Sequence, residues 1–490
     1  MTLSSPNALT SEVNVHPYRR LLRNLTSILF GDLFGRFIGF LTAIVLARYL
    51  GPQDYGKYSL VTSFAYLFMV LSDFGLDDLI VMNVAKDRSL ASEYVTASFL
   101  IKLLFSFLSI VALILLVLVM GYSKEIVLCT AIFSMHLIFI TLSNALSSIY
   151  KAFERMEYAS MIMIVNAAVG FALIIGLVYF HGTLLEIIFS RVFTFFVGFV
   201  VSFVVLLRKF AKPKMSVDVG LIRQLVINAF PFLLVGIIVT LYFKVDIIML
   251  SKIKGELYVG WYAAAANDLF FGLVVIPRCI SIVTFPMFSR QYAESPDQLK
   301  KSCNFTVKSV TILGIPISAG TVFLAPQIID FVFGPQYANS VGVLQIIAIA
   351  ITLVFIREPL SYALTAVGKV RILMWINAIS LALNILLNLV LITAYAHIGA
   401  AIASVACMIA SLALIHQYLA KSIRGIEVIR NVFKPLLSAL LMCFIIYPLR
   451  KANILIPAVV GATSYFFFVF LLGTFSTPEL NVIKGLFRKA

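Results

Sequence analysis

Residues 30–40 read FGDLFGRFIGF and lie within a run that is otherwise apolar from Leu25 to Ala47. A run of this length can cross the hydrocarbon core of a bilayer as a helix, which needs about 20 residues. Asp32 and Arg36 lie near the middle of the run, where an ionised side chain costs at least about 2.5–3.5 kcal/mol. The two side chains are four residues apart, with the acid first, so we expect them to form an ion pair on one helix face.

Small residues recur at every fourth position beside this pair, namely Gly31, Gly35, Gly39, Ala43 and Ala47. Such a stripe lets a second helix approach closely. We therefore expect the stripe to pack against a neighbouring helix, and Arg36 to line a polar pathway with Asp32 setting its orientation. A self-neutralising pair that only fixes packing is the alternative.

The composition of the whole chain indicates the same environment as this first run. Hydrophobic residues make up 61% of the 490 residues and charged residues 12%, against about 25% charged in soluble domains. The mean hydropathy is +1.04. Because apolar runs of about 20 residues recur along the chain, the sequence predicts an all-α polytopic membrane protein with about 14 transmembrane helices.

Lys and Arg residues are distributed unevenly between alternate loops. One side holds 25 of them and the other side 7, so the positive-inside rule predicts that both termini are cytoplasmic in a multi-pass protein of the cell membrane. The net charge of +16 follows mostly from this bias and suits anionic headgroups. It does not indicate a nucleic-acid partner.

Weak internal repeats predict two halves with the same topology. VGWY at 259–262 is similar to YGKY at 55–58, and an even number of predicted spans separates them. Parallel repeats of this kind are related by an axis along the membrane normal. The predicted segments are a cytoplasmic N-terminal segment (1–24), an N-terminal six-helix bundle (25–207), a cytoplasmic linker (208–224), a C-terminal six-helix bundle (225–420), and two extra transmembrane helices with a cytoplasmic tail (421–490).

Six basic residues lie inside predicted spans: Arg36, Lys102, Arg191, Lys244, Arg278 and Arg357. Lys102 is early in its span, so we expect its side chain to reach the cytoplasmic interface. For Arg191 and Lys244, which lie within about two turns of the outer surface, the same behaviour is one alternative. The other is that they line a cavity.

Acidic residues accompany these cations, namely Asp73, Asp77 and Asp78 at the cytoplasmic end of the second predicted span, and further on Asp246, Asp268 and Glu358. Glu358 follows Arg357 directly, and adjacent side chains point about 100° apart on a helix, so the two cannot simply cancel. Ionisable groups spread over several spans favour a shared central cavity, as in a transporter. The surplus of cations favours an anionic substrate.

The motifs of this chain resemble a known family, the Wzx-type polysaccharide-unit flippases of the multidrug/oligosaccharidyl-lipid/polysaccharide exporter superfamily. The resemblance covers essentially the whole chain. It rests on LARYLGPQDYGKYSLV (46–61), DFGL (73–76), VAKDR (84–88), NAFPFLLVG (228–236), KVDIIMLSKI (244–253), VGWYAAA (259–265), FGPQYANS (333–340) and NILLNLVLI (384–392).

This resemblance implies two bundles that open alternately to either side of the membrane around a cationic lumen. It also implies a substrate in which a short oligosaccharide is attached to a polyprenyl diphosphate, translocated to the outer leaflet for cell-surface polysaccharide biosynthesis. The lumen role is expected for Arg36, Lys244, Arg278, Arg357 and Arg191. Asp32, Asp73, Asp246, Asp268 and Glu358 are the expected supporting acids, and coupling to protons or sodium ions stays open.

Other functions remain as alternatives. A cation-coupled drug antiporter of the same superfamily would have a similar fold, and an integral-membrane glycan polymerase or ligase would be an enzyme. The short outer loops and the lack of a Walker A sequence argue against an enzyme. The His residues show no metal-binding spacing, and no cofactor is expected. The expected partners are the lipid-linked oligosaccharide, membrane lipids, and a glycan polymerase with other assembly proteins.

Overall fold

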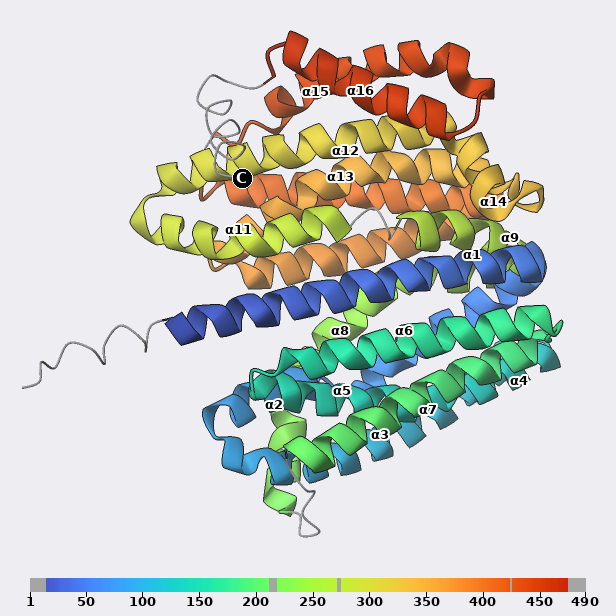
Figure 1. Ribbon diagram of the computed structural model, residues 1–490, viewed down its shortest axis with the longest axis vertical. Helices are drawn as coiled ribbons and strands as arrows, with labels where there is room; N and C mark the ends of the chain where they lie inside the picture. The colour runs from blue at the N-terminus through green and yellow to red at the C-terminus, as the bar shows by residue number, and fades with distance from the viewer. Residues whose placement is uncertain (1–14, 211–217, 271–274, 424, 475–490) are drawn as a thin grey trace, which may run out of the picture. The chain divides into compact units, whose positions relative to one another are not determined.

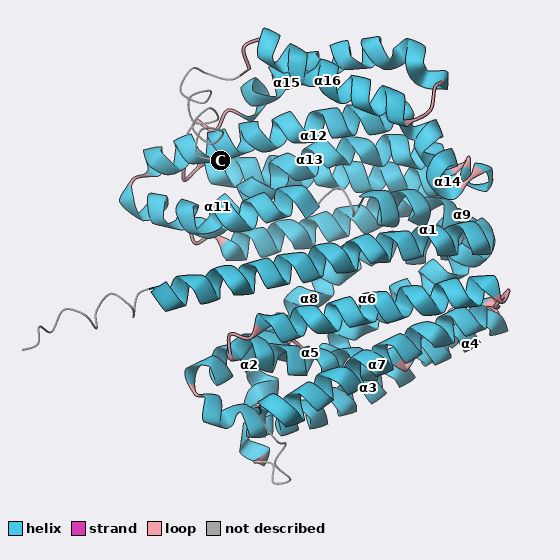
Figure 2. Cartoon of the chain, in the orientation of Figure 1, coloured by secondary structure: helices cyan, strands magenta, loops and turns pink. Residues whose placement is uncertain are grey.

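The computed structural model describes residues 15–210, 218–270, 275–423 and 425–474. Helices make up almost all of these residues, and the described ranges contain no strand (Figure 2). The prediction of an all-α fold is therefore confirmed. Apolar runs form helices because a helix satisfies its backbone N–H and C=O groups internally, as the hydrocarbon core requires.

Within the described ranges, ten helices are long and apolar enough to cross a membrane. Non-helical backbone kinks lie at Gly51 (φ 70°) within α1 (Val15–Asp73) and at Ala396 (φ 51°) within α14 (Val370–Ala420). A further apolar helix, α16 (Leu455–Leu471), is shorter. The chain is a multi-pass membrane protein, and the number of about 14 crossings stays a prediction.

Contacts within the chain divide it into two compact units. Unit 1 comprises Met1–Leu50 and Lys57–Lys244, and unit 2 comprises Gly51–Gly56 and Val245–Ala490. The short segment of α1 that carries the kink therefore belongs to unit 2, although the rest of that helix belongs to unit 1.

The helices follow one another along the chain as Figure 1 shows. In unit 1, α1 is followed by α2 (Leu76–Lys86), the 3₁₀ turn η2 (Arg88–Leu90), α3 (Ala91–Val119), α4 (Lys124–Ser134), α5 (His136–Ala152), α6 (Met156–Tyr179), α7 (Leu184–Lys209) and most of α8 (Val219–Lys254). In unit 2, the end of α8 is followed by α9 (Glu256–Ala263), the π-helical η3 (Ala264–Leu269), α11 (Val275–Glu294), α12 (Pro296–Phe333), η4 (Pro335–Tyr337), α13 (Ser340–Ala366), α14, α15 (Val428–Ile446), η5 (Tyr447–Lys451) and α16.

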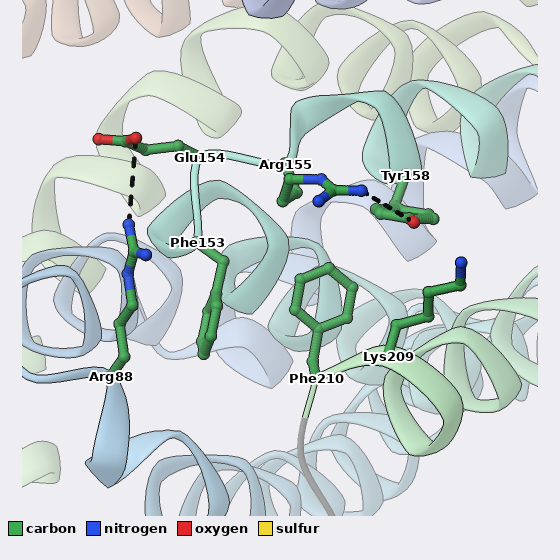
Figure 3. A pocket seen from close by; sticks show the side chains of 7 residues that line it. All are labelled: Arg88, Phe153, Glu154, Arg155, Tyr158, Lys209 and Phe210. Carbon is green, nitrogen blue, oxygen red and sulfur yellow. Dashed lines mark hydrogen bonds and ion pairs between the residues drawn. The ribbon is translucent and has the colours of Figure 1, made fainter. Parts of the chain in front are cut away.

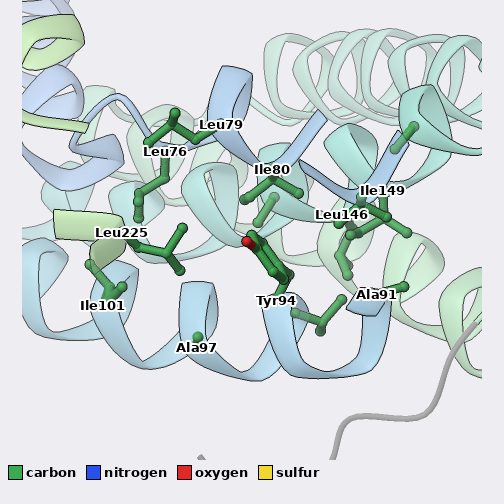
Figure 4. Close-up of a cluster of buried hydrophobic side chains, with 14 of the residues drawn as sticks. Leu76, Leu79, Ile80, Ala91, Tyr94, Ala97, Ile101, Leu146, Ile149 and Leu225 are labelled. Carbon is green, nitrogen blue, oxygen red and sulfur yellow. The ribbon is translucent and has the colours of Figure 1, made fainter. Parts of the chain in front are cut away.

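The core of unit 1 is formed where α2, α3, α5 and α8 meet (Figure 4). Leu76 and Ile80 from α2 lie beside Ile101 of α3 and Ile149 of α5, and all four are almost fully buried. Leu225 from α8 completes this cluster. The cluster fixes the chain around the turn between α1 and α2, which carries charged residues described below.

The first part of α8 packs in unit 1, whereas the predicted C-terminal bundle begins at residue 225. Gly75 (φ 71°) allows this packing, because a Cβ atom there would lie 2.7 Å from the Phe232 Cβ and 2.9 Å from the Leu233 nitrogen. No side chain other than hydrogen would permit α8 to approach this turn so closely. The predicted segment boundaries stay predictions, and residues 1–14, 211–217 and 475–490 of the predicted termini and linker lie outside the described residues.

The core of unit 2 is formed by α11, α12, α13 and α14, with Phe288, Val307, Leu360 and Ile415 fully buried. α15 and α16 pack against α12 through a separate cluster. There the buried Tyr465 hydroxyl donates a hydrogen bond to the Ile312 carbonyl oxygen at 2.9 Å. The last two helices are thus attached to unit 2 by their own apolar contacts.

Candidate functional site

Arg36 and Asp32 form the ion pair that their spacing predicts. The Arg36 Nε donates to the Asp32 Oδ2 at 2.8 Å. The side chains are 44% and 33% exposed, respectively. A pair with this exposure keeps its guanidinium and carboxylate accessible to polar groups beside the helix.

The small-residue stripe beside this pair does not form a continuous packing face. Gly31 is in close contact, since a Cβ there would lie 2.8 Å from the Ser160 Cβ of α6. At Gly35 and Gly39, no atom of the described chain lies within 4 Å of that position. The expectation that the stripe packs along its whole length is therefore wrong, because it is in close contact at Gly31 and open at Gly35 and Gly39.

Arg191 and Lys244 lie around one tyrosine, and we call Tyr66, Arg191 and Lys244 the Tyr66 cluster. The Lys244 Nζ lies 5.4 Å from the centroid of the Tyr66 ring, which suits a cation–π contact. Arg191 interacts electrostatically with Tyr66 and lies within hydrogen-bonding reach of the Tyr58 hydroxyl. Two cations, one from α7 and one from α8, thereby contact tyrosines of α1.

The surroundings of Arg191 leave part of its guanidinium without a partner. Its Nε is buried and has no hydrogen-bond partner among the described residues. Gly170 of α6 makes room for this side chain, because a Cβ there would lie 3.1 Å from an Arg191 terminal nitrogen. Phe195 covers the guanidinium at 6.0 Å from its ring centroid. A buried donor of this kind is available to an anionic ligand.

Lys102 does not extend to the membrane interface, which corrects the expectation from its position. Its side chain is completely buried, and its Nζ donates to Asp73 at 2.5 Å, to Asp77 at 2.7 Å and to the Thr141 carbonyl at 3.2 Å. We call Lys102, Asp73 and Asp77 the Lys102 triad. An isolated lysine would be too costly here, but two carboxylates and a carbonyl satisfy its three donors.

Sequence reasoning missed the triad because the turn between α1 and α2 brings its acids together. Phe74 (φ 56°) and Gly75 (φ 71°) are both left-handed, so α1 ends at Asp73 and α2 begins at Leu76. One signal was available in α3. Ser98, Ser106 and Ser109 share the buried face of Lys102, a polar stripe at helical spacing that points into the bundle.

Arg357 makes polar contacts with α14 in unit 2. Its Nε donates to the Ser411 hydroxyl at 2.9 Å, and one terminal nitrogen donates to the Asn377 Oδ1 at 2.9 Å. Its other terminal nitrogen lies 3.4 Å from Glu358. Glu358 therefore does contact Arg357, although helix geometry predicted that adjacent side chains would point apart. The two shortest contacts of Arg357, however, go to the neutral Ser411 and Asn377.

Arg278 belongs to the same polar region. It lies within hydrogen-bonding reach of the Tyr362 hydroxyl, and Glu358 also interacts with that tyrosine. We call Tyr362, Arg278, Arg357 and Glu358 the Tyr362 cluster. Arg278 and Glu358 meet at Tyr362, and Arg357 joins this cluster through its contact with Glu358.

Asp246 is buried among neutral hydrogen-bond donors. It accepts from the Tyr262 hydroxyl at 2.9 Å, the Ser404 hydroxyl at 2.7 Å and the Asn388 amide at 2.8 Å. The Asn388 amide also donates to the Asn384 Oδ1 at 2.9 Å, and the Asn388 Oδ1 is buried without a partner in the described chain. We call Asp246, Tyr262, Asn388 and Ser404 the Asp246 network.

The motif residues at 51–56 meet the region around Asp268. The Tyr55 hydroxyl donates a hydrogen bond to Asp268, which lies in the π-helical η3. A Cβ on Gly56 would collide with the Glu256 carbonyl oxygen, and one on Gly260 would collide with the Pro52 carbonyl oxygen. The two motifs that resemble each other in sequence thus pack directly together, and both need glycine at the contact.

The structure therefore groups the predicted site residues into separate sets. Arg191 and Lys244 come together in unit 1, and Arg278, Arg357 and Glu358 in unit 2. Of the predicted acids, Asp32, Asp73 and Glu358 have cationic partners, whereas the hydrogen bonds to Asp246 come from neutral groups. Arginine and lysine donors in a poorly solvated setting can bind phosphate oxygens strongly.

Comparisons with known proteins identify the family and the fold of the chain. Residues 21–292 match the model of the family described as polysaccharide biosynthesis protein, and residues 231–390 match a second model named MatE. A Klebsiella pneumoniae protein described as an "Uncharacterized membrane protein in cps region" is 24% identical over 479 residues, with 92% of this chain and 94% of that protein covered.

Two solved structures share the fold. The lipid II flippase MurJ in an inward closed conformation has a TM-score of 0.76 at 16% identity, covering 91% of this chain and 98% of that chain. A multidrug resistance MATE family transporter of the MOP superfamily, in an inward-facing conformation, has a TM-score of 0.64 at 14% identity. The match covers 79% of this chain and 95% of that chain. At these identities the likeness concerns the fold.

Proposed function

The chain belongs to the polysaccharide biosynthesis protein family, as its motifs predicted, and on this basis we propose that it is a lipid-linked oligosaccharide flippase. It moves an oligosaccharide attached to a polyprenyl diphosphate from the cytoplasmic to the outer leaflet, for cell-surface polysaccharide biosynthesis. Alternating access to a cationic central cavity carries the substrate, and both termini are cytoplasmic.

The observation that carries this proposal is the Tyr66 cluster. Two cations of spanning helices contact tyrosines, and the Arg191 Nε is buried without a partner in the described chain. Fixed donors of this kind compensate the desolvation of a diphosphate as it leaves the aqueous interface. A cationic drug would gain nothing from such a site.

The proposed roles follow from the contacts of each residue. Five cations are proposed to contact the diphosphate during its passage, namely Arg36, Arg191, Lys244, Arg278 and Arg357. Asp32 holds the orientation of Arg36. Glu358 orients Arg357, Asp268 supports Tyr55, and Asp73 supports Lys102. Asp246 is the residue that binds a coupling proton or sodium ion.

The membrane potential adds a driving force in the proposed direction. With the cytoplasm negative, each negative charge that moves outward gains about 2.3 kcal/mol per 100 mV. A diphosphate that crosses with two net charges would gain about 4–5 kcal/mol. Coupling to a cation gradient at Asp246 would add to the driving force from the membrane potential.

Transport in reconstituted vesicles tests the proposal. A labelled polyprenyl-diphosphate oligosaccharide starts on the Lys/Arg-rich side, and its arrival in the opposite leaflet is measured for the unmodified protein, Arg191→Gln and Arg36→Ala. We expect each variant to flip at a tenth of the normal rate or less, because one charge-assisted contact contributes about 1.5–3 kcal/mol.

Arg36→Lys and Arg430→Gln serve as matched controls. Arg36→Lys keeps the charge and should restore part of the rate, whereas Arg430 is an exposed residue paired with Glu427 at 3.0 Å and should not matter. Unchanged flipping in both Arg191→Gln and Arg36→Ala would mean that these cations are packing residues and would refute the assigned path.

A drug antiporter of the same superfamily is the second candidate. The match to the MatE model over 231–390 and the Asp246 network in the same region favour it. A proton-driven antiporter would export a cationic dye from the same vesicles and leave the lipid-linked oligosaccharide in place. Lipid flipping without dye export would exclude it, and would also leave a glycan polymerase or ligase without support.

A further inference from the structure

A pocket of about 420 Å³ opens in unit 1, apart from the residues assigned to the transport path. Three segments form it, namely the η2 turn, the turn between α5 and α6, and the end of α7. Its walls carry three cations, one acid and three aromatic rings (Figure 3): Arg88, Arg155, Lys209, Glu154, Phe153, Tyr158 and Phe210. All three segments belong to the side of the protein that is rich in Lys and Arg.

The three cations are only partly neutralised by neighbouring acids. Arg88 lies 4.0 Å from Glu154, and both side chains are more than half exposed, so this pair is weak. Arg155 is paired more closely with Glu157, at 2.5 Å. Within the described residues, Lys209 has no ion-pair partner. Three cations therefore face two carboxylates.

Asp87, the acid next to Arg88 in sequence, is held by its own turn. Its carboxylate accepts hydrogen bonds from the Ser89 backbone nitrogen at 2.9 Å and the Ser89 hydroxyl at 2.7 Å. These bonds hold the pKa of Asp87 below its usual value. Asp87 is thus committed to capping the turn.

The aromatic rings give the pocket an ordered apolar floor. Phe210 packs edge-on against Phe153 and Tyr158, at 5.4 and 5.3 Å between ring centroids. The Arg88 guanidinium lies 5.4 Å from the Phe153 ring centroid, and the Arg155 guanidinium 5.4 Å from that of Tyr158. Figure 3 shows the rings of Phe153 and Phe210 between Arg88 and Lys209. Stacking on the rings pre-orders the cations and leaves their N–H donors available.

We propose that this pocket binds the headgroup of an anionic phospholipid from the leaflet on the Lys/Arg-rich side. The pocket lies where membrane-spanning helices end, which is the level at which aromatic and basic residues meet lipid phosphates. Its cations are half exposed, so a free phosphate ion would be held weakly. A lipid phosphate is confined to this level by its own chains, which raises its local concentration.

Native mass spectrometry of the full chain in detergent tests the site. Phosphatidylglycerol and phosphatidylcholine are added in separate titrations to the unmodified protein and to Arg88→Gln/Lys209→Gln. Losing two cations, at about 1 kcal/mol each, should weaken the first phosphatidylglycerol bound by about thirtyfold. Phosphatidylcholine binding, which does not depend on net charge, should be the same in both proteins.

The matched control is Arg290→Gln/Arg430→Gln, which removes two charges from the same side of the protein. Both residues are strongly exposed and pair with Glu294 and Glu427, respectively. Equal losses of phosphatidylglycerol affinity in the two double variants would show that only the overall charge matters. This result would refute the pocket as the binding site. So would an unchanged affinity in Arg88→Gln/Lys209→Gln.

Glu154→Gln provides an opposite change that misfolding cannot imitate. Removing the acid that faces Arg88 should tighten phosphatidylglycerol binding by about fivefold. Weaker or unchanged binding would contradict the proposal. Inorganic phosphate at millimolar concentration should not displace the lipid, and displacement would identify the pocket as a site for free phosphate instead of a lipid headgroup.

Discussion

The Lys102 triad and the Asp246 network each contain a buried charge, the ammonium group of Lys102 and the carboxylate of Asp246, and these two charges are compensated in opposite ways. In unit 1, two carboxylates surround a completely buried ammonium group. In unit 2, one carboxylate receives hydrogen bonds from two hydroxyls and an amide. A charge that is already paired gains little from a further ion, whereas one held by neutral dipoles can still gain energy from a cation. The comparison indicates a structural role for Lys102 and a coupling role for Asp246.

The largest expected effect is that of Lys102→Ala. The substitution would leave Asp73 and Asp77 side by side and without their cation, at an expected cost of about 3–5 kcal/mol in the free energy of unfolding. Thermal unfolding in detergent would measure this change. The exposed ion-pair variant Arg430→Ala should cost less than about 1 kcal/mol. An equal, small effect of both variants would remove the distinction between the two carboxylate sites.

A neutralised triad sharpens the same test. Lys102→Met combined with Asp73→Asn and Asp77→Asn removes all three charges while nearly preserving the side-chain volumes. A buried ionic cluster replaced in this way usually costs little, so most of the stability lost in Lys102→Ala should return. If flipping also returns, the triad has only a structural role. A stable protein that does not flip would assign the triad to transport and contradict our interpretation.

A smaller effect is expected for Ser404→Ala. It removes one hydroxyl donor from Asp246 and leaves Tyr262 and Asn388 in place, so we expect a loss of about 1.5–3 kcal/mol in the free energy of unfolding. Ser411→Ala, which removes a neutral partner of Arg357, is a comparable change elsewhere on α14. No loss in Ser404→Ala would mean that water already satisfies the carboxylate, and that Asp246 is less isolated than its contacts indicate.

The smallest effect on stability is expected for Asp246→Asn. The amide can keep the same neighbours because hydroxyl groups either donate or accept, so the free energy of unfolding should change by less than about 1 kcal/mol. Transport should lose its dependence on a proton or sodium gradient. The measurement compares flipping with and without each gradient, and Asp73→Asn is the control that should keep the dependence. Gradient dependence that survives in Asp246→Asn would refute the coupling role.

Local pattern was sufficient for several features of this protein. Runs of about 20 apolar residues predict spanning helices, because in hydrocarbon the backbone N–H and C=O groups must form hydrogen bonds with one another. The spacing of Asp32 and Arg36 predicted their 2.8 Å contact, since residues four apart are neighbours on any helix. The motifs predicted the family correctly. These features depend on residues that are close in sequence or on composition alone.

Other features required partners from distant parts of the chain. Lys102 was expected at the interface, but Asp73 and Asp77 pair with it across the point where two left-handed residues interrupt the helix between α1 and α2. The packing of α8 into unit 1 likewise depends on Gly75 meeting residues more than a hundred positions away.

The amino-acid sequence by itself determined the helical membrane fold, the family and the types of charge available for an anionic substrate. Only the tertiary structure decided which charges meet. Arg191 and Lys244 share Tyr66, while Asp246 is surrounded by neutral donors. The reason is that the free-energy cost of a charge in a membrane depends on its nearest partners. Helix packing supplies those partners from segments that are far apart in the sequence.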